Sequence, residues 1–573
     1  MNKKHVRSVV WHTRLLYTAL AAGLAGFAVE AAAAGVAWQA NGVQVCSDPS
    51  SQETPYIVGL DVSGSIVVWA DRRGSDYNIY AQRLDAEGRR LWQPGEITVC
   101  SAPYDQQFPV ACEDGASGVI VVWQDGRKGD DGMELYAQRI NPDGSLAWQA
   151  DGVPVCTHAA NLEDPPTAFS HVIISDGAGG AIVAWRDTRA DPVAGNTEIY
   201  AQRINGSGVP LWTANGVKVL GFATQKWATR NPVLASDGAN GAVVVWQDAR
   251  NSAVTGNDLY AQRVSSAGVP LWTTNGVAVC NAPGEQGYPD IVELAGAQTA
   301  IVWEDKRSGS YDIYAQKLDA AGVPQWGANG RLVCDSANDQ RTPRVITDGA
   351  GGVLVAWTDK RNSSLYTDIY AQRLSPSGSP VWMSQGAAVC TATGSQTRIR
   401  MCPSVSGRAI LTWMDTRNET APAVYDIFGQ MIDQYGLVQW AEAGIPVGAI
   451  PGTNQRMQQA ASDGMGGLLT VWEDDRNSGD WDVYAQRLTP WTLVTGISDA
   501  KSQLGGTPVV IPAGIVSAVF ADCIYVQDPT RCSGIKVLCP LSVAVGDLVT
   551  VWGTVEPGCE RYIIASRLLK ASP

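Results

Sequence analysis

Eight copies of the motif Trp-x-Asp-x-Arg place an acidic and a basic residue two positions apart. Their Trp residues are Trp69, Trp123, Trp185, Trp246, Trp303, Trp357, Trp413 and Trp472. In the fifth copy Asp305 and Arg307 follow Trp303, and a further acid, Asp312, opens the next segment. Side chains two apart on an extended strand project to the same side. Asp305, Arg307 and Asp312 could therefore form a cation site through oxygen ligands, or an anion site through the guanidinium.

A structural role is the alternative for the same residues. A catalytic residue is needed once, whereas this pair recurs in nearly every repeat, as a fastening between two strands would. Calcium bound once per repeat stays possible, and no other cofactor is predicted. The sequence assigns no catalytic residue, no cofactor-binding residue and no metal ligand.

Histidine is too scarce for zinc binding or histidine-based catalysis. His158 and His171 are the two His residues beyond the first 34 positions. They lie in and just after a long connection, so they are candidate binding residues, with incidental surface positions as the alternative reading.

Repeated patterns around these residues predict short antiparallel strands. In residues 343–390, strands are expected at 344–346, 353–357 and 369–374, with an Asp-Gly turn after the first and a short fourth strand that ends at 389–390. The second strand of each repeat is continuously apolar, which indicates burial on both faces. Four strands per unit, repeated at intervals of about 58 residues, predict a β-propeller.

The two ends of the repeat region complement each other. Residues 38–46 match the end of a repeat, compare 272–280, while the last repeat stops at Leu488 without that ending. The N-terminal segment is therefore expected to supply the outer strand of the final blade. We predict an all-β fold, an eight-bladed propeller of four-stranded blades closed by an N-terminal strand, spanning residues 35–488.

One sequence segment in each repeat resembles a segment of known propeller families. Residues 318–326, Leu-Asp-Ala-Ala-Gly-Val-Pro-Gln-Trp, are similar to the tryptophan-docking repeat of eight-bladed quinoprotein dehydrogenases. That resemblance implies that a Gly and a Trp lock neighbouring blades, but the adjacent cysteine pair of that family is absent here. The unit also resembles TolB-type propellers, which have a similar Asp-Ile-Tyr strand. Both resemblances concern architecture.

Cysteine positions predict two disulfides. Cys112 and Cys402 each follow a repeat cysteine, Cys100 or Cys390, by twelve residues. Export would permit the bonds Cys100–Cys112 and Cys390–Cys402, with isolated buried thiols as the alternative.

The N-terminus and the charge bear on location and partners. Lys3, Lys4, Arg7 and Arg14 precede an apolar run at 15–29 and a small-residue stretch, the order of a secretory signal peptide at residues 1–34. The net charge of −14 becomes more negative once this segment is removed. An acidic chain repels phosphate backbones, so nucleic acid is not an expected partner. We expect a monomeric protein without a transmembrane segment after cleavage, secreted, periplasmic or on the cell surface.

The repeat ends after Leu488, and a second domain follows. Residues 489–497 are expected to form a linker, and five strand-like runs in residues 498–573 predict a small β-barrel. Their pattern resembles OB-fold-like domains of exported bacterial proteins. The four cysteines of this domain, which allow three pairings, are Cys523, Cys532, Cys539 and Cys559.

Connection lengths favour one face of the propeller for binding. The variable connections are those after Trp-x-Asp-x-Arg and after the fourth strand, and both lie on the same face of an alternating blade. We therefore expect an exported, non-enzymatic protein that binds a protein or glycan there, or serves as a scaffold. The alternative is an enzyme, either a quinoprotein-like dehydrogenase or a polysaccharide-acting hydrolase or lyase.

Overall fold

The structure of the protein is a computed structural model. It describes residues 35–570 except 47, 61–63, 130–131, 158–170, 188, 190–196, 221–231, 419–423, 478, 494–496, 503–507, 521–522, 529–532, 540–542 and 557–560. The predicted signal peptide lies outside the described residues. Among the described residues, no helix is long and apolar enough to cross a membrane.

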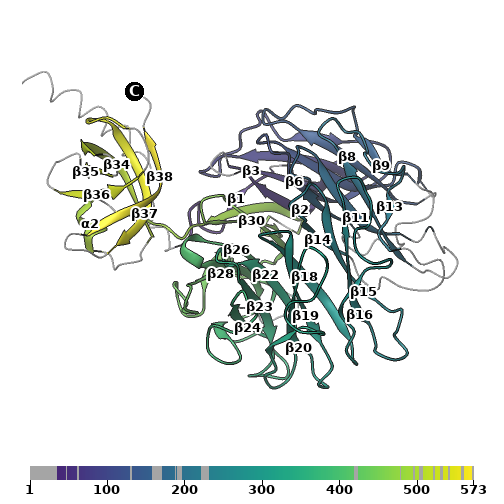
Figure 1. Ribbon diagram of the computed structural model, residues 1–573. Helices are drawn as coiled ribbons and strands as arrows, with labels where there is room; N and C mark the ends of the chain where they lie inside the picture. The colour runs from purple at the N-terminus through teal and green to yellow at the C-terminus, as the bar shows by residue number, and fades with distance from the viewer. Residues whose placement is uncertain are drawn as a thin grey trace, which may run out of the picture.

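Eight four-stranded antiparallel sheets are arranged around a central axis, as predicted (Figure 1). Blade 1 contains β2 (Gln52–Gly59), β3 (Ser65–Asp71), β4 (Asn78–Leu84) and β5 (Ile97–Cys100). Blade 2 contains β6 (Gln106–Glu113), β7 (Val119–Asp125), β8 (Glu134–Ile140) and β9 (Val153–Cys156). Blade 3 contains β10 (His171–Ser175), β11 (Ala181–Asp187), β12 (Glu198–Ile204) and β13 (Val217–Lys218). Blade 4 contains β14 (Val233–Ser236), β15 (Ala242–Asp248), β16 (Asp258–Val264) and β17 (Val277–Cys280).

The second half of the ring repeats the same strand order. Blade 5 contains β18 (Gln286–Leu294), β19 (Gln298–Asp305), β20 (Asp312–Leu318) and β21 (Arg331–Cys334). Blade 6 contains β22 (Gln340–Thr347), β23 (Val353–Asp359), β24 (Asp368–Leu374) and β25 (Ala387–Cys390). Blade 7 contains β26 (Gln396–Pro403), a 3₁₀ turn η3 (Val405–Gly407), β27 (Ala409–Asp415), β28 (Asp426–Ile432) and β29 (Ile445–Gly448). Blade 8 contains β30 (Gln455–Ser462), β31 (Leu468–Asp474), β32 (Asp482–Leu488) and β1 (Val43–Gln44).

The N-terminal segment closes the ring. Val43 of β1 pairs with Ala485 of β32, and an isolated bridge joins Val36 to Leu488. Trp38, which is 7% exposed, donates its backbone N–H to the Gln486 side-chain oxygen at 3.0 Å. The N-terminal and C-terminal segments of the propeller therefore share the sheet of blade 8. The closing strand predicted from the sequence is confirmed.

Blade packing follows from the burial of the second strands. All seven residues of β23 are buried, which explains their continuous apolar pattern. The first strands of adjacent blades contact each other around the axis, so the first strand of each blade is the innermost. The eight Trp residues of the repeated motif are each fully buried.

A second set of Trp residues docks each blade on the turn of the next. In one joint the Trp326 indole donates to the Pro376 carbonyl at 3.2 Å. Gly378, two residues further on, has φ +78°, and a Cβ added there would lie 2.7 Å from the Trp326 ring. Glycine is thus required at position 378 for two reasons: the backbone has a positive φ, and the Trp326 ring approaches closely.

We expect Gly378→Ala to destabilise the propeller more than a matched change in the same blade. Gly349 has φ +72° but nothing within 4 Å of an added Cβ, so Gly349→Ala tests the backbone strain alone. Gly349→Ala should cost about 1 kcal/mol. Gly378→Ala should cost about 2–4 kcal/mol, because overpacking of Trp326 is added. Guanidinium midpoints of the two variants measure the difference, and equal midpoints would contradict the docking role.

The predicted disulfides Cys100–Cys112 and Cys390–Cys402 were wrong, and all four residues are buried free thiols. Cys100 ends the outermost strand of blade 1, whereas Cys112 lies in the innermost strand of blade 2. A separation of twelve residues therefore crosses the width of a blade. Cys390 and Cys402 have the same relation in blades 6 and 7.

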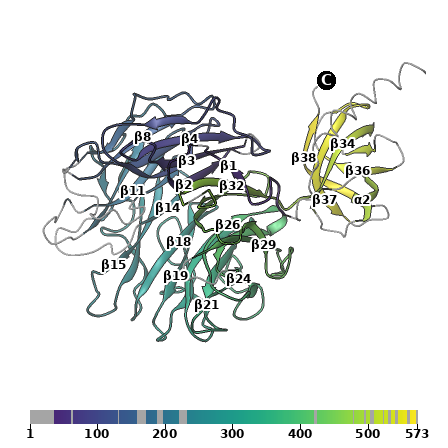
Figure 2. The ribbon, with the colours of Figure 1, turned by 180° about the vertical axis from the view of Figure 1, so that it is seen from behind.

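The C-terminal residues form a second sheet that closes on itself beside the propeller (Figures 1 and 2). Its strands are β33 (Thr492–Leu493), β34 (Pro508–Val519), β35 (Cys523–Gln527), β36 (Gly534–Leu538), β37 (Leu548–Glu556) and β38 (Tyr562–Lys570), with helix α2 (Ile497–Ser502) after β33. The pairing β34–β37 closes a five-stranded barrel with the order β34-β35-β36-β38-β37. The barrel is confirmed. Cys532 and Cys559 lie outside the described residues, so cysteine pairing in this domain stays a prediction.

Candidate functional site

Asp305 and Arg307 fasten strands rather than line an open site. Asp305 is fully buried, and its carboxylate accepts hydrogen bonds from the Trp303 indole at 2.8 Å and from the Arg307 guanidinium at 2.6 Å. Arg307 Nη2 also donates to the Asn329 carbonyl at 3.0 Å, and its guanidinium stacks 3.9 Å above the Tyr314 ring centre. Both carboxylate oxygens of Asp305, and Nε and Nη2 of Arg307, are engaged within the protein.

The same pair also joins neighbouring blades. Arg307 Nη2 lies 3.0 Å from the Cys280 sulfur, which belongs to the last strand of blade 4. All eight copies of the motif have the Trp–Asp hydrogen bond and the Asp–Arg ion pair. The geometry therefore matches the structural alternative for this motif.

The other candidate residues are dispersed. Asp312 is 1% exposed and accepts a hydrogen bond from the Ser308 hydroxyl at 2.5 Å, and burial raises the pKa of its carboxyl. His171 is fully buried at the start of β10, 3.4 Å from the Val122 carbonyl, and burial lowers its pKa to about 4. His158 lies outside the described residues. Among the described residues, no group of three or more His, Cys, Asp or Glu side chains could hold a metal ion.

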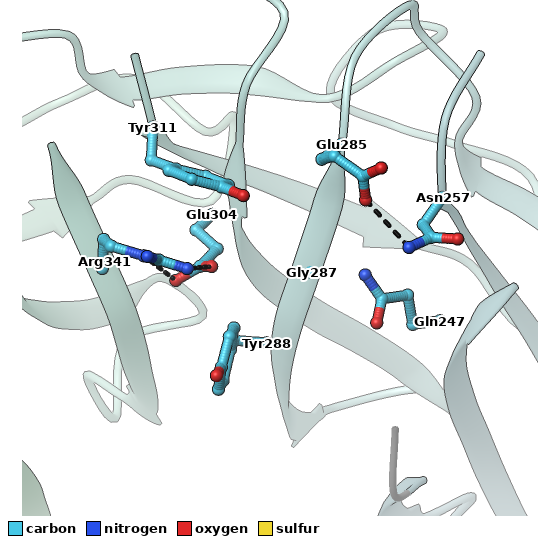
Figure 3. Close-up of a pocket in the computed structure, with 8 residues that line it drawn as sticks. All are labelled: Gln247, Asn257, Glu285, Gly287, Tyr288, Glu304, Tyr311 and Arg341. Carbon is cyan, nitrogen blue, oxygen red and sulfur yellow. Dashed lines mark hydrogen bonds and ion pairs between the residues drawn. The ribbon is translucent and has the colours of Figure 1, made fainter. Parts of the chain in front are cut away.

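A pocket of about 150 Å³ opens at the junction of blades 4, 5 and 6. It lies on the face formed by the connections after Trp-x-Asp-x-Arg and after the fourth strands, which is the face that connection lengths favoured. Figure 3 shows its eight lining residues, Gln247, Asn257, Glu285, Gly287, Tyr288, Glu304, Tyr311 and Arg341.

The space comes from a missing side chain in β18. Gly287 is the second residue of its strand, where other first strands carry Glu53, Gln107, Arg341, Thr397 and Arg456. A Cβ at Gly287 would lie 3.0 Å from the Gln247 side-chain nitrogen. Glycine in blade 5 therefore leaves a pocket where the five other first strands described at this position supply a side chain.

Glu304 and Arg341 form the charged wall of this pocket. Glu304 is 1% exposed, and its Oε1 lies 2.6 Å from Arg341 Nη2. The backbone N–H of Thr342 donates to its other oxygen at 3.0 Å. The hydrogen bond to Glu304 raises the pKa of Arg341, so the guanidinium stays charged at neutral pH. The wall thus offers a fixed, charge-balanced set of donors and acceptors.

The opposite wall carries a carboxylate and two amides. Asn257 donates to Glu285 at 2.8 Å, and Gln247 donates to the Gln286 carbonyl at 2.7 Å. Figure 3 shows these side chains on one side of Gly287, with Glu304 and Arg341 on the other.

Two tyrosines complete the lining. The Arg341 guanidinium lies 4.1 Å from the Tyr311 ring centre but 5.8 Å from that of Tyr288. Tyr311 is therefore covered by a cation, and its hydroxyl points toward the centre of the pocket (Figure 3). Tyr288 is 36% exposed and has φ +48°, a strained conformation for a residue other than glycine.

The sequence patterns did not indicate these lining residues, because the candidate residues were those that recur in every repeat. The pocket depends on a departure from the repeat, at Gly287. Aligning the first strands on their leading Gln, as in Gln286 and Gln340, would have exposed it.

Comparisons with known proteins indicate no family. No protein-family model matches the chain, and no curated protein is significantly similar to it in sequence. Among solved structures, a protein of unknown function from Dyadobacter fermentans is 9% identical, with 79% of this chain and 99% of that chain covered and a TM-score of 0.36. An endo-arabinase from Bacteroides thetaiotaomicron is 14% identical, covering 46% and 95%, with a TM-score of 0.28. A putative TolB from Agrobacterium tumefaciens is 16% identical, covering 60% and 94%, with a TM-score of 0.27. No functional conclusion follows from these values.

Proposed function

We propose that the protein is an exported, non-enzymatic glycan-binding protein that holds a sugar ring in the pocket at Gly287. The observation that carries this proposal is the lining: one exposed aromatic ring, Tyr288, beside carboxylates and amides held in fixed directions. Sugar hydroxyls both donate and accept hydrogen bonds, so they pair with Glu285, Asn257 and similar groups. The C–H face of a sugar packs on an aromatic ring.

The size of the pocket favours a single ring over a larger compact ligand. About 150 Å³ is well below the usual volume of a small-molecule cleft. The rest of an oligosaccharide would extend along the same face. Both oxygens of Glu304 are occupied by Arg341 and Thr342, which favours a positioning role over acid–base chemistry.

Gly287→Gln tests the proposal by supplying the side chain that blade 2 carries at the equivalent Gln107. It should fill the pocket and weaken binding at least tenfold, while the fold is retained because the close neighbour is the flexible end of Gln247. A glycan array with the mature protein identifies the ligand, and calorimetry with that oligosaccharide measures the affinity.

The matched control is Thr397→Gln, which makes the same residue at the same strand position in blade 7 and should leave binding unchanged. Equal loss in both variants, or no glycan bound on the array, would contradict the proposal. Appearance of new reducing ends during incubation with the ligand would instead favour the polysaccharide-acting enzyme.

A further inference from the structure

A second feature lies deeper in the ring, on the innermost strands. In each blade, one residue of the first strand pairs with the residue before the buried motif Trp. These eight equivalent residues, here called the channel ring, are Tyr56, Val110, Val172, Val233, Asp290, Arg344, Arg400 and Gln459. Because the strand register is the same in all blades, they occupy one level around the central axis.

The channel ring is divided in charge. Blades 2, 3 and 4 contribute valines, whereas blades 5, 6 and 7 contribute Asp290, Arg344 and Arg400. Arg344 Nη1 lies 3.7 Å from Asp290, whose other oxygen accepts the Val345 N–H at 2.9 Å. The only acid of the channel ring is therefore already shared between Arg344 and the backbone.

Within the part of the chain that the structure describes, the partners of Arg400 are neutral. Its Nε donates to the Gln459 side-chain oxygen at 3.0 Å, and its Nη1 donates to the Ile399 carbonyl at 3.2 Å. It forms no ion pair with any residue that the structure describes. A guanidinium has five N–H donors, and Arg400 is a partly buried cation, for which the absence of a counter-charge is unfavourable.

The electrostatic surroundings of Arg400 come from several blades. Burial, and then the charges of Arg344 and Arg398, lower its pKa to about 9. Asp290 of blade 5 and Tyr56 of blade 1 also act on it. Tyr56 and Asp290 belong to blades that are not neighbours of blade 7, because blade 8 separates blade 1 from it and blade 6 separates blade 5 from it. An excess of positive charge is thus concentrated inside a chain whose net charge is −14.

We propose that the channel ring binds an oxyanion, a carboxylate or a sulfate group, with Arg400 as its principal ligand. The planar guanidinium donates two parallel N–H bonds to such a group, which supplies the missing counter-charge. Arg344 adds positive charge from blade 6. The Tyr56 hydroxyl supplies a donor from blade 1, since burial raises its pKa and keeps it protonated.

Calorimetry with the mature full-length protein tests this inference, with sodium sulfate and sodium D-glucuronate as probes against sodium chloride at constant ionic strength. At least one probe should bind, and Arg400→Gln should weaken that binding at least tenfold. Binding of glucuronate alone identifies a carboxylate site, and binding of sulfate alone a sulfate site. Absence of binding by both probes, or equal binding by Arg400→Gln, would overturn the proposal.

Two further variants separate this site from the pocket and from misfolding. Arg341→Gln removes an arginine that is already paired with Glu304, so anion binding should persist. Gly287→Gln should block glycan binding and leave the anion site intact, because the two proposals concern different residues.

In chloride, Arg400→Gln should unfold at the same or a higher guanidinium concentration than the wild type, because it removes an uncompensated charge. If that variant does not fold, Arg344→Gln is expected to weaken anion binding in the same assay.

Discussion

Removal of residues 35–46 is expected to cause the largest loss of stability of any small change in this protein. It deletes β1, exposes the edge of β32, and removes the buried Trp38 side chain from the last joint. Burial of an indole alone contributes on the order of 5 kcal/mol as an upper bound. We expect a fall in the free energy of unfolding of at least about this size, since the edge pairing is lost as well.

Differential scanning calorimetry of the truncated protein measures this effect. A synthetic peptide of residues 35–46 should restore part of the lost melting temperature, whereas a scrambled peptide should not. An unchanged melting temperature after truncation would show that the ring does not depend on this strand.

Asp305→Ala is expected to cost about 3 kcal/mol, because it leaves the Arg307 guanidinium without its counter-charge and the Trp303 indole without an acceptor. The remaining contacts of Arg307, with Asn329 and Tyr314, limit the loss. The midpoint of guanidinium unfolding measures it.

The matched control is Glu87→Ala, which removes the partner of a largely exposed arginine, Arg89. Exposed pairs contribute little, so this change should cost less than about 1 kcal/mol. If Asp305→Ala and Glu87→Ala lower the free energy of unfolding equally, the buried Asp305–Arg307 pair does not hold the strands together. If calcium restores the midpoint of Asp305→Ala, a metal contributes there.

Much of the fold could be predicted because the same physical constraint recurs eight times. A strand such as β23 must be apolar on both faces when blades cover it, and its turns need Asp-Gly at fixed places. The incomplete last repeat predicted the closure by Trp38 and β1. The cysteine pairing failed for a related reason: spacing along the chain does not reveal that Cys100 and Cys112 lie at opposite edges of adjacent blades.

The site was harder to predict because it depends on exceptions. Gly287 has no side chain, and Arg400 has no carboxylate partner among the described residues. Each is a single residue within a repeated strand. Asp305 and Arg307 were candidate site residues because their motif occurs in every repeat. Such recurrence indicates a shared structural role. In a closed array of similar blades, a binding site is expected where one blade differs from the others.

A crystal structure of residues 35–573 with the best oligosaccharide from the glycan array is the most direct test of the central claim. The account predicts a sugar ring packed against Tyr288, with its hydroxyls bonded to Glu285 and Asn257 over Gly287. A sugar bound at another blade junction or on the C-terminal barrel, with this pocket empty, would contradict it.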